Sequence, residues 1–236
     1  MNNQEIKAEA GNVFKRQLGL FQGNGVTMDD FRELPILVIG CGGVGSFTVA
    51  NLGKMGCQNL AVCDSDTVEK HNRPNQQFGL KDIGESKVYA MWCFLKERED
   101  IDIKMYEYFF PHQTIITRKV VIVTVDSLEA RKKIWAEVKN DPNVELFIDA
   151  RMGGIISEMY VIDRVYTSHH NFYERSLEFT PSEEPCTERS VLFCVDGLTS
   201  LIGSAVRNFH LGNDNPTLTT VNWEKFAMYP KHIRKS

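Results

Sequence analysis

The sequence has no run of about 18 apolar residues, so no segment is predicted to span a membrane. It has no excess of positive charge either: the formal net charge is -4, which argues against a broad nucleic-acid surface. No internal repeat and no low-complexity tract is visible in its 236 residues. That length is sufficient for one large α/β domain with a sizeable core.

Cysteine pairs of the C-x-x-C type are also missing, although the chain holds six cysteines. A tetrathiolate zinc site would need two such pairs, so no zinc is predicted. A disulfide framework is atypical of a chain of this size, and residues 1–10 have no apolar core that would indicate a secretory signal. A reducing, cytoplasmic location is therefore expected.

What the sequence does contain is an alternation of apolar runs and amphipathic stretches. Buried parallel strands are predicted at 35–39, 60–63, 120–125 and 146–148. Strands that alternate with helices predict an α/β, Rossmann-like, doubly wound and mostly parallel sheet. The other predicted elements are strands at 104–109, 157–165 and 218–223 and helices at 46–54, 86–98, 128–139, 169–178 and 190–211.

The pattern changes after Gly154, because the following stretch alternates like an antiparallel strand. We expect a single domain over 1–236, with an N-terminal helical arm over about 1–33 and an antiparallel C-terminal extension over about 155–236. The basic tail, 231–235, is expected to fray.

A glycine loop follows the first predicted strand, in the order Gly40-Cys41-Gly42-Gly43-Val44-Gly45. Its glycines allow a tight turn and a close approach to phosphates, and the next helix offers unpaired N–H groups to an anion. Asp64 lies about 20 residues further on, where an acid accepts hydrogen bonds from ribose hydroxyls. Both features are equally typical of an NAD-dependent oxidoreductase, although no hydride-transfer acid or base is evident. Asp66 fits either a turn or a site.

Four further residues favour a nucleotide whose phosphates react: Asn72, Gln76, Lys87 and Asp126. A site for a triphosphate with Mg²⁺ needs a carboxylate for the metal, cations for the phosphates and amides to orient them. Asp126 supplies the carboxylate and Lys87, at a helix start, the cation. A helix cap for Asp126 and a solvated surface position for Lys87 are the alternatives. Asp64, Asp126 and Asp149 are all predicted to follow strand ends, where ligands of such sheets bind.

Taken together, these residues resemble the ThiF, MoeB and HesA family of ubiquitin-activating-enzyme-like adenylyltransferases, over about residues 14–209. Residues 40–46 are similar to the family's G-x-G-G-V-G-S loop, and residues 14–17 to its R-Y-x-R-Q element. Residues 64–68 resemble its D-x-D-x-V segment, and residues 84–88 its G-x-x-K-V element. Asn72 and Asp126 fall at a family Asn and at the metal-binding Asp.

The resemblance implies an ATP- and Mg²⁺-dependent homodimer that adenylates the C-terminal carboxylate of a ubiquitin-like or sulfur-carrier protein. It implies that Asp64 holds the ribose, that Asn72 and Lys87 contact the phosphates and that Asp126 coordinates Mg²⁺. Arg16 would reach ATP across the dimer interface as an arginine finger. The other expected nucleotide contacts are Gly40, Gly42, Gly43, Val44, Gly45, Asp66, Arg73 and Gln76.

One position departs from the family pattern. Its N-L-x-R-Q becomes Asn72-Arg73-Pro74-Asn75-Gln76, so Asn75 stands where a phosphate-binding Arg is expected. An Asn cannot give the charged, bidentate contact of an Arg, and Arg73 is the residue that could compensate. The alternative function is therefore a catalytically weakened, nucleotide-binding dimeric scaffold that recruits a carrier protein.

Cys186 is the candidate nucleophile, because Glu184-Pro185-Cys186-Thr187 resembles the Cys-Thr of the thioester-forming loop in larger relatives. A thiolate there could capture the activated acyl group. Cys194, inside a predicted helix, is interpreted as a packing residue.

Overall fold

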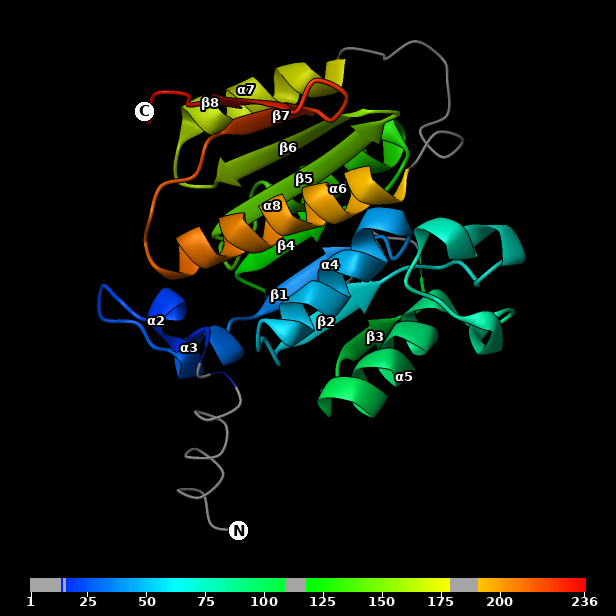
Figure 1. Ribbon diagram of the computed structural model, residues 1–236. Helices are drawn as coiled ribbons and strands as arrows, with labels where there is room; N and C mark the ends of the chain where they lie inside the picture. Colours follow the sequence, from blue (N-terminus) through cyan, green and yellow to red (C-terminus); the bar gives the residue numbers. More distant parts are fainter. Residues whose placement is uncertain (1–13, 15, 109–117, 179–190) are drawn as a thin grey trace.

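The computed structural model describes residues 14, 16–108, 118–178 and 191–236. Its parallel strands are β1 (Ile36–Ile39), β2 (Leu60–Cys63), β3 (Lys104–Tyr106), β4 (Val120–Val123) and β5 (Leu146–Gly153). They lie in the order β3-β2-β1-β4-β5, so the winding direction reverses between β1 and β4 (Figure 1). Ligands of open α/β sheets bind at such a reversal, beyond the carboxyl ends of the strands.

The sheet continues beyond β5 with antiparallel strands. They are β6 (Ile156–Asp163), β7 (Leu218–Asn222) and β8 (Ala227–Lys231). One eight-stranded sheet therefore runs through the described chain. The predicted α/β Rossmann-like class, mostly parallel with an antiparallel C-terminal extension, is confirmed.

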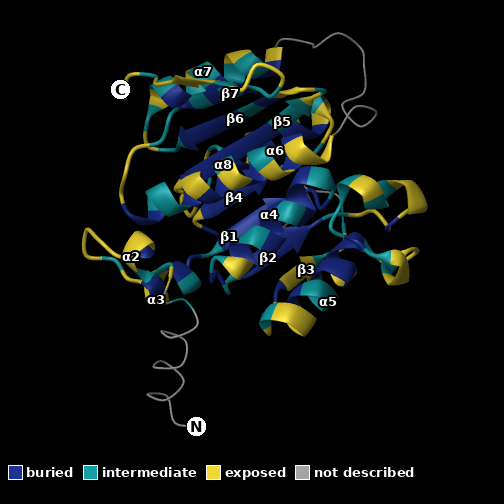
Figure 2. Cartoon of the chain, viewed as in Figure 1, coloured by how far each residue is buried: buried dark blue, intermediate teal, exposed yellow. Residues whose placement is uncertain are grey.

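Helices cover both faces of the sheet. Packed on one face are α4 (Gly43–Lys54), α5 (Lys87–Glu99) and α8 (Leu192–His210). The other face is covered by α6 (Leu128–Val138) and α7 (Thr167–Glu178). Because both faces are covered, β1, β2 and β4 are buried at every position (Figure 2). The short helices are α2 (Leu18–Phe21), α3 (Met28–Arg32), η1 (Lys70–Asn75) and η2 (Leu80–Asp82).

The C-terminal segment differs from its prediction. Residues 231–235 were expected to fray, yet β8 pairs with β7 through Lys231 and the residues beyond it are also held. Ser168 donates its hydroxyl to the carbonyl of Arg234 at 2.7 Å, and Lys235 forms an ion pair with Asp214. The expectation of a frayed tail is therefore wrong, since a local sequence pattern could not reveal these distant partners.

Candidate functional site

A cleft of about 810 Å³ opens at the carboxyl ends of β1, β2 and β4, where the winding direction reverses. It brings together the glycine loop, the end of β2, η1 and the segment after β4. Most of the predicted site residues line it, namely Gly40, Gly42, Gly43, Val44, Asp64, Asp66, Asn72, Gln76, Lys87 and Asp126. Residues far apart in the sequence thus meet in one place.

The glycine loop is held tightly against the end of β4. Gly40 has a φ of +93°, which residues with a side chain rarely adopt, and a Cβ there would meet backbone atoms of Thr124 and Val125 at 3.0–3.1 Å. The Thr124 hydroxyl donates to the Gly40 carbonyl at 2.8 Å. A Cβ on Gly45 would lie 1.9 Å from that same carbonyl oxygen, so Gly45 is required for packing although it does not line the cleft. The glycines therefore serve two purposes: they allow close packing against the end of β4, and they leave space for a ligand in the cleft.

The first turn of α4 is a candidate anion site. The helix begins at Gly43 rather than at the predicted Ser46, and its N-cap, Gly42, provides no side-chain hydrogen bond. The first N–H groups of an α-helix have no partner within the helix, and the helix dipole adds positive charge there. This end of α4 lies on the cleft wall, as a phosphate site requires.

Asp64 is fixed at the end of β2 by two backbone donors. Its Oδ2 accepts from the amide of Cys41 at 2.5 Å and its Oδ1 from that of Asp66 at 2.8 Å. Burial raises the pKa of Asp64 above its usual 3.8, and the Lys87 ammonium acts in the opposite direction. Each carboxylate oxygen keeps a further lone pair, so both remain able to accept hydroxyl donors from a ligand.

Lys87 is a buried cation, with only 7% of its surface exposed, so the solvated alternative is wrong. Its Nζ lies 2.7 Å from Oδ2 of Asp66. Burial by itself lowers the pKa of Lys87, but Asp64 and Asp66 outweigh it and raise that pKa above 10.5. The cleft thus holds a permanent positive charge beside two carboxylates.

Asp126 lies on the opposite wall, after β4, and is exposed. The cap of α6 is Ser127, whose hydroxyl accepts from the amide of Ala130 at 3.3 Å, so the cap alternative for Asp126 is wrong. No group of three metal-ligating side chains occurs within the described ranges. Mg²⁺ in nucleotide sites is commonly held by one or two carboxylates together with phosphate oxygens, and Asp126 fits that requirement.

The turn around η1 supplies amides. The side chain of Asn72 accepts from the amide of Glu69 at 2.9 Å, which places it on the cleft wall. The buried Oε1 of Gln76 has no hydrogen-bond partner among the described residues, and Gln76 lines the cleft, so this oxygen can accept from a ligand. Asn75 lines the cleft too, whereas Arg73, although partly buried, does not.

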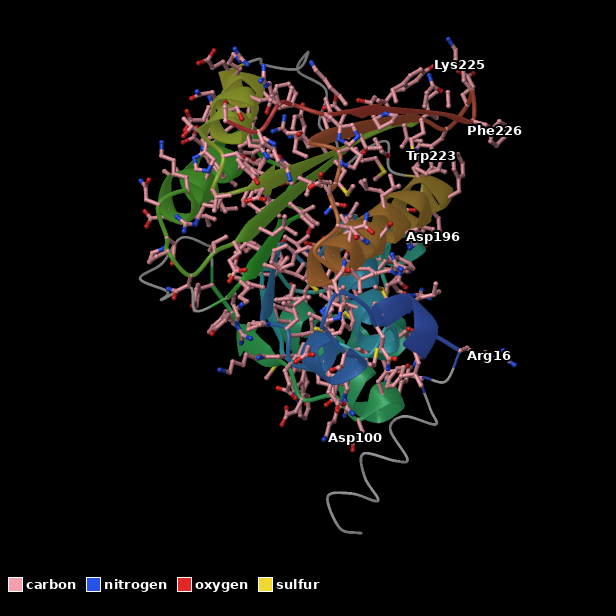
Figure 3. The ribbon with its side chains drawn as sticks, turned by 90° about the vertical axis from the view of Figure 1, so that its left-hand side faces the viewer. Arg16, Asp100, Asp196, Trp223, Lys225 and Phe226 are labelled. Carbon is pink, nitrogen blue, oxygen red and sulfur yellow. The ribbon has the colours of Figure 1, made fainter. Side chains whose placement is uncertain are left out.

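Two predicted residues are not brought into the cleft. Arg16 is exposed and projects into solvent from the segment before α2 (Figure 3). Its neighbour Gln17 donates to the carbonyl of Lys54, at the far end of α4 from the glycine loop. Cys186 lies outside the described residues. Cys194, interpreted from the sequence as a packing residue, is fully buried.

Sequence reasoning missed Arg131, which also lines the cleft. It is buried on α6 and forms an ion pair with Asp149, which is fully buried within β5. The prediction that Asp149 follows a strand end is wrong, because β5 continues to Gly153. An available signal was the position of Arg131 four residues before Trp135, on the apolar face of its helix.

Comparison with known proteins agrees with this geometry. The chain is 34% identical over 116 residues to the NEDD8-activating enzyme E1 catalytic subunit of Dictyostelium discoideum, covering 43% of this chain and 24% of that protein. The Arabidopsis thaliana subunit of the same name is 32% identical over 131 residues, covering 49% and 27%. The chain thus spans about a quarter of the length of these relatives.

Solved structures share the fold at low identity. The crystal structure of E. coli MccB with AMPCPP and MccA matches with a TM-score of 0.73 at 15% identity, over 95% of this chain and 72% of that one. The PaaA structure matches with a TM-score of 0.75 at 15% identity, over 99% and 84%. No helix in the described part of the chain is both long and apolar enough to cross a membrane. The model of the ThiF family matches residues 14–224, most of the sequence, and the chain belongs to that family.

Proposed function

We propose that this protein is an ATP-dependent adenylyltransferase that activates the C-terminal carboxylate of a ubiquitin-like or sulfur-carrier protein. A carboxylate oxygen attacks the α-phosphorus of ATP, the bond to pyrophosphate breaks, and an acyl-adenylate forms. The observation that supports this best is the cleft, which unites an uncapped helix N-terminus, the Asp64 and Asp66 carboxylates with Lys87, and Asp126. A dehydrogenase has no need of a buried lysine and an exposed carboxylate around its phosphates.

Each group has a role that its position allows. The first turn of α4 holds phosphate oxygens, and Asp64 accepts hydrogen bonds from the ribose. Lys87 offsets the negative charge that builds up on the departing pyrophosphate. Asp126, with phosphate oxygens, would hold Mg²⁺, which neutralises phosphate charge when bound. Asn72 and Gln76 orient the phosphate chain.

The names of the relatives support the choice of partner. The neighbouring MccB structure contains MccA beside a nucleotide analogue, and the sequence relatives are named as NEDD8-activating subunits. Both descriptions favour a peptide or small-protein carboxylate as the second substrate. We also propose a homodimer in which Arg16 completes the cleft of the other subunit, and a thioester step on Cys186 after adenylation.

The second function, a nucleotide-binding scaffold with weakened catalysis, has its own support. Asn75 lines the cleft where the family pattern has an arginine, and Arg73 is not among the cleft-lining residues. A site without that charge binds the triphosphate but stabilises the reacting phosphates less.

Exchange of radioactive pyrophosphate into ATP, measured with a panel of carrier proteins and peptides, tests the first proposal. Adenylation predicts exchange that requires both a carrier and Mg²⁺ and that is lost in Asp126→Asn. Absence of exchange across the panel, with ATP binding intact, would favour the scaffold. Asn75→Arg then separates the two further, since a gain in exchange shows that the missing arginine limits a real activity.

A further inference from the structure

A buried carboxylate, Asp149, pairs with one of the cleft-lining residues. Asp149 has no exposed surface, and charged or polar donors meet both of its oxygens. Oδ1 pairs with the Arg131 guanidinium, while Oδ2 accepts from Nε of Arg151 at 2.7 Å and from the Tyr173 hydroxyl at 3.0 Å. A buried carboxylate that meets this many donors holds them in fixed places.

Arg131 faces the cleft from this network. Its Nη2 donates to the carbonyl of Val125 and, at 3.2 Å, to that of Ala150. Val125 directly precedes Asp126, and Ala150 belongs to β5. The Arg131 guanidinium thus links the segment after β4 to β5 through two hydrogen bonds, and its ion pair with Asp149 fixes the position of the guanidinium.

We propose that Arg131, anchored by Asp149, is a positioning residue that fixes the main chain of Asp126 and thereby sets where that carboxylate can meet a metal-bound triphosphate. This inference rests on the proposed function and names a residue to which the family resemblance assigned no role. Asp126 is exposed and is not the cap of α6, so its own side chain does little to fix it. The constraint therefore comes from the peptide that Arg131 holds.

An arginine is needed here because the three acceptors meet two different nitrogens of the guanidinium. The planar fork can serve the Asp149 carboxylate and the carbonyls of Val125 and Ala150 at once. A lysine keeps the charge for Asp149 but concentrates its donors at one nitrogen. Arg131→Lys therefore loosens the Asp126 segment while it preserves the buried ion pair.

The test measures ATP affinity with Mg²⁺ and with EDTA, so that the gain due to the metal is isolated. Arg131→Lys is expected to reduce that gain about tenfold, as is typical when a group that orients a metal ligand is lost, and thus to weaken ATP binding more with Mg²⁺ than with EDTA. Arg118→Lys is the matched control. Arg118 is also a buried arginine that donates to a carbonyl, that of Asn59 at 3.1 Å, but it precedes β4 at the opposite end from the cleft.

A double-mutant cycle decides whether the effect passes through Asp126. In an Asp126→Asn background, Arg131→Lys is expected to cost nothing further, since the group it positions is gone. Additive losses, or an equal loss in Mg²⁺ and EDTA, would overturn the inference and indicate a direct contact with the nucleotide. The control Arg118→Lys must lower the thermal midpoint without changing the gain due to Mg²⁺.

Tyr173→Phe provides a milder variant if Arg131→Lys fails to fold. It removes one donor from Asp149 and keeps the packed ring, so the same Mg²⁺-dependent gain should fall by a smaller factor. An unchanged gain in that variant would then overturn the inference. Wild-type protein whose ATP affinity ignores Mg²⁺ would overturn it as well. Mg²⁺-dependent binding without pyrophosphate exchange would instead overturn only the adenylation proposal.

Discussion

Lys87 offers the clearest prediction at the scale of single residues. Lys87→Met removes the buried cation that pairs with Asp66, and we expect ATP affinity to fall about ten- to hundredfold, the range for losing a charge-assisted contact. Lys81→Met is the control, because Lys81 forms a comparable ion pair with Glu97 at 2.8 Å, but on the exposed surface. Calorimetric titration of ATP checks both variants. Equal losses would mean that the position of Lys87 in the cleft does not matter.

The pKa of Asp64 predicts a pH dependence of stability. Burial raises this pKa above 3.8, so the folded state binds the proton more tightly than the unfolded chain does. Its contribution to stability is therefore complete below about pH 3.8 and is lost as the pH rises through the folded value. Asp64→Asn cannot titrate. The unfolding free energy of Asp64→Asn relative to wild type should rise with pH across this window, in urea titrations at several pH values. A relative decline would mean that the pKa is lowered instead.

The site residues differ in how far a sequence can reveal them. Asp64, Lys87 and Asp126 could be predicted because each follows a strand or begins a helix, and parallel strands bring those points together. The position of Arg131 on the apolar face of α6 signalled its burial but not its contacts, because its acceptors are two main-chain carbonyls and a carboxylate on β5. The sequence also could not show whether Arg73 replaces the missing arginine, because that depends on which residues of η1 line the cleft.

At the scale of elements, the glycine loop separates packing from binding. A Cβ at Gly45 would strike the Gly40 carbonyl at 1.9 Å and the Thr124 hydroxyl at 2.6 Å, so Gly45→Ala should lower the unfolding free energy by about 1–3 kcal/mol. A Cβ at Gly42 would meet nothing within 4 Å and would stand on the cleft wall. Gly42→Ala should therefore lose less stability yet bind ATP more weakly. Urea unfolding and nucleotide titration on both variants test this, and the reverse ranking of stabilities would contradict it.

The buried strands were accessible to sequence, whereas the edge strand β8 was not. β1, β2 and β4 are short apolar runs, mostly β-branched in β1 and β4, as is typical of a sheet covered on both faces. β8 contains Pro230 and Lys231 and is mostly exposed, so neither its composition nor its burial signals a strand. β8 is a strand because it pairs with β7, and such a tertiary contact is not visible in the local sequence, so the tail was expected to fray.

At the scale of the whole molecule, the two ends of α4 lie next to different parts of the proposed site. Its first turn faces the cleft, and its last turn meets the segment that carries Arg16. A helix of 12 residues is about 18 Å long, so Arg16 lies far beyond the reach of its own glycine loop. An arginine finger at this position can serve only another subunit. The proposed homodimer can therefore be tested by mixing variants.

Mixing two inactive variants tests that assembly. Arg16→Ala lacks the finger but keeps an intact cleft, and Asp126→Asn lacks the metal ligand but keeps the finger. If Arg16 acts across a two-fold interface, each mixed dimer contains one complete site, and equal amounts of the variants should recover roughly one quarter of wild-type pyrophosphate exchange. Arg234→Ala mixed with Asp126→Asn is the control, because the first variant keeps both the cleft and Arg16. Its activity should fall on mixing only in proportion to its share of the subunits. An Arg16→Ala sample that stays inactive in the mixture, although light scattering shows that subunits exchange, would mean that Arg16 serves no site in its partner.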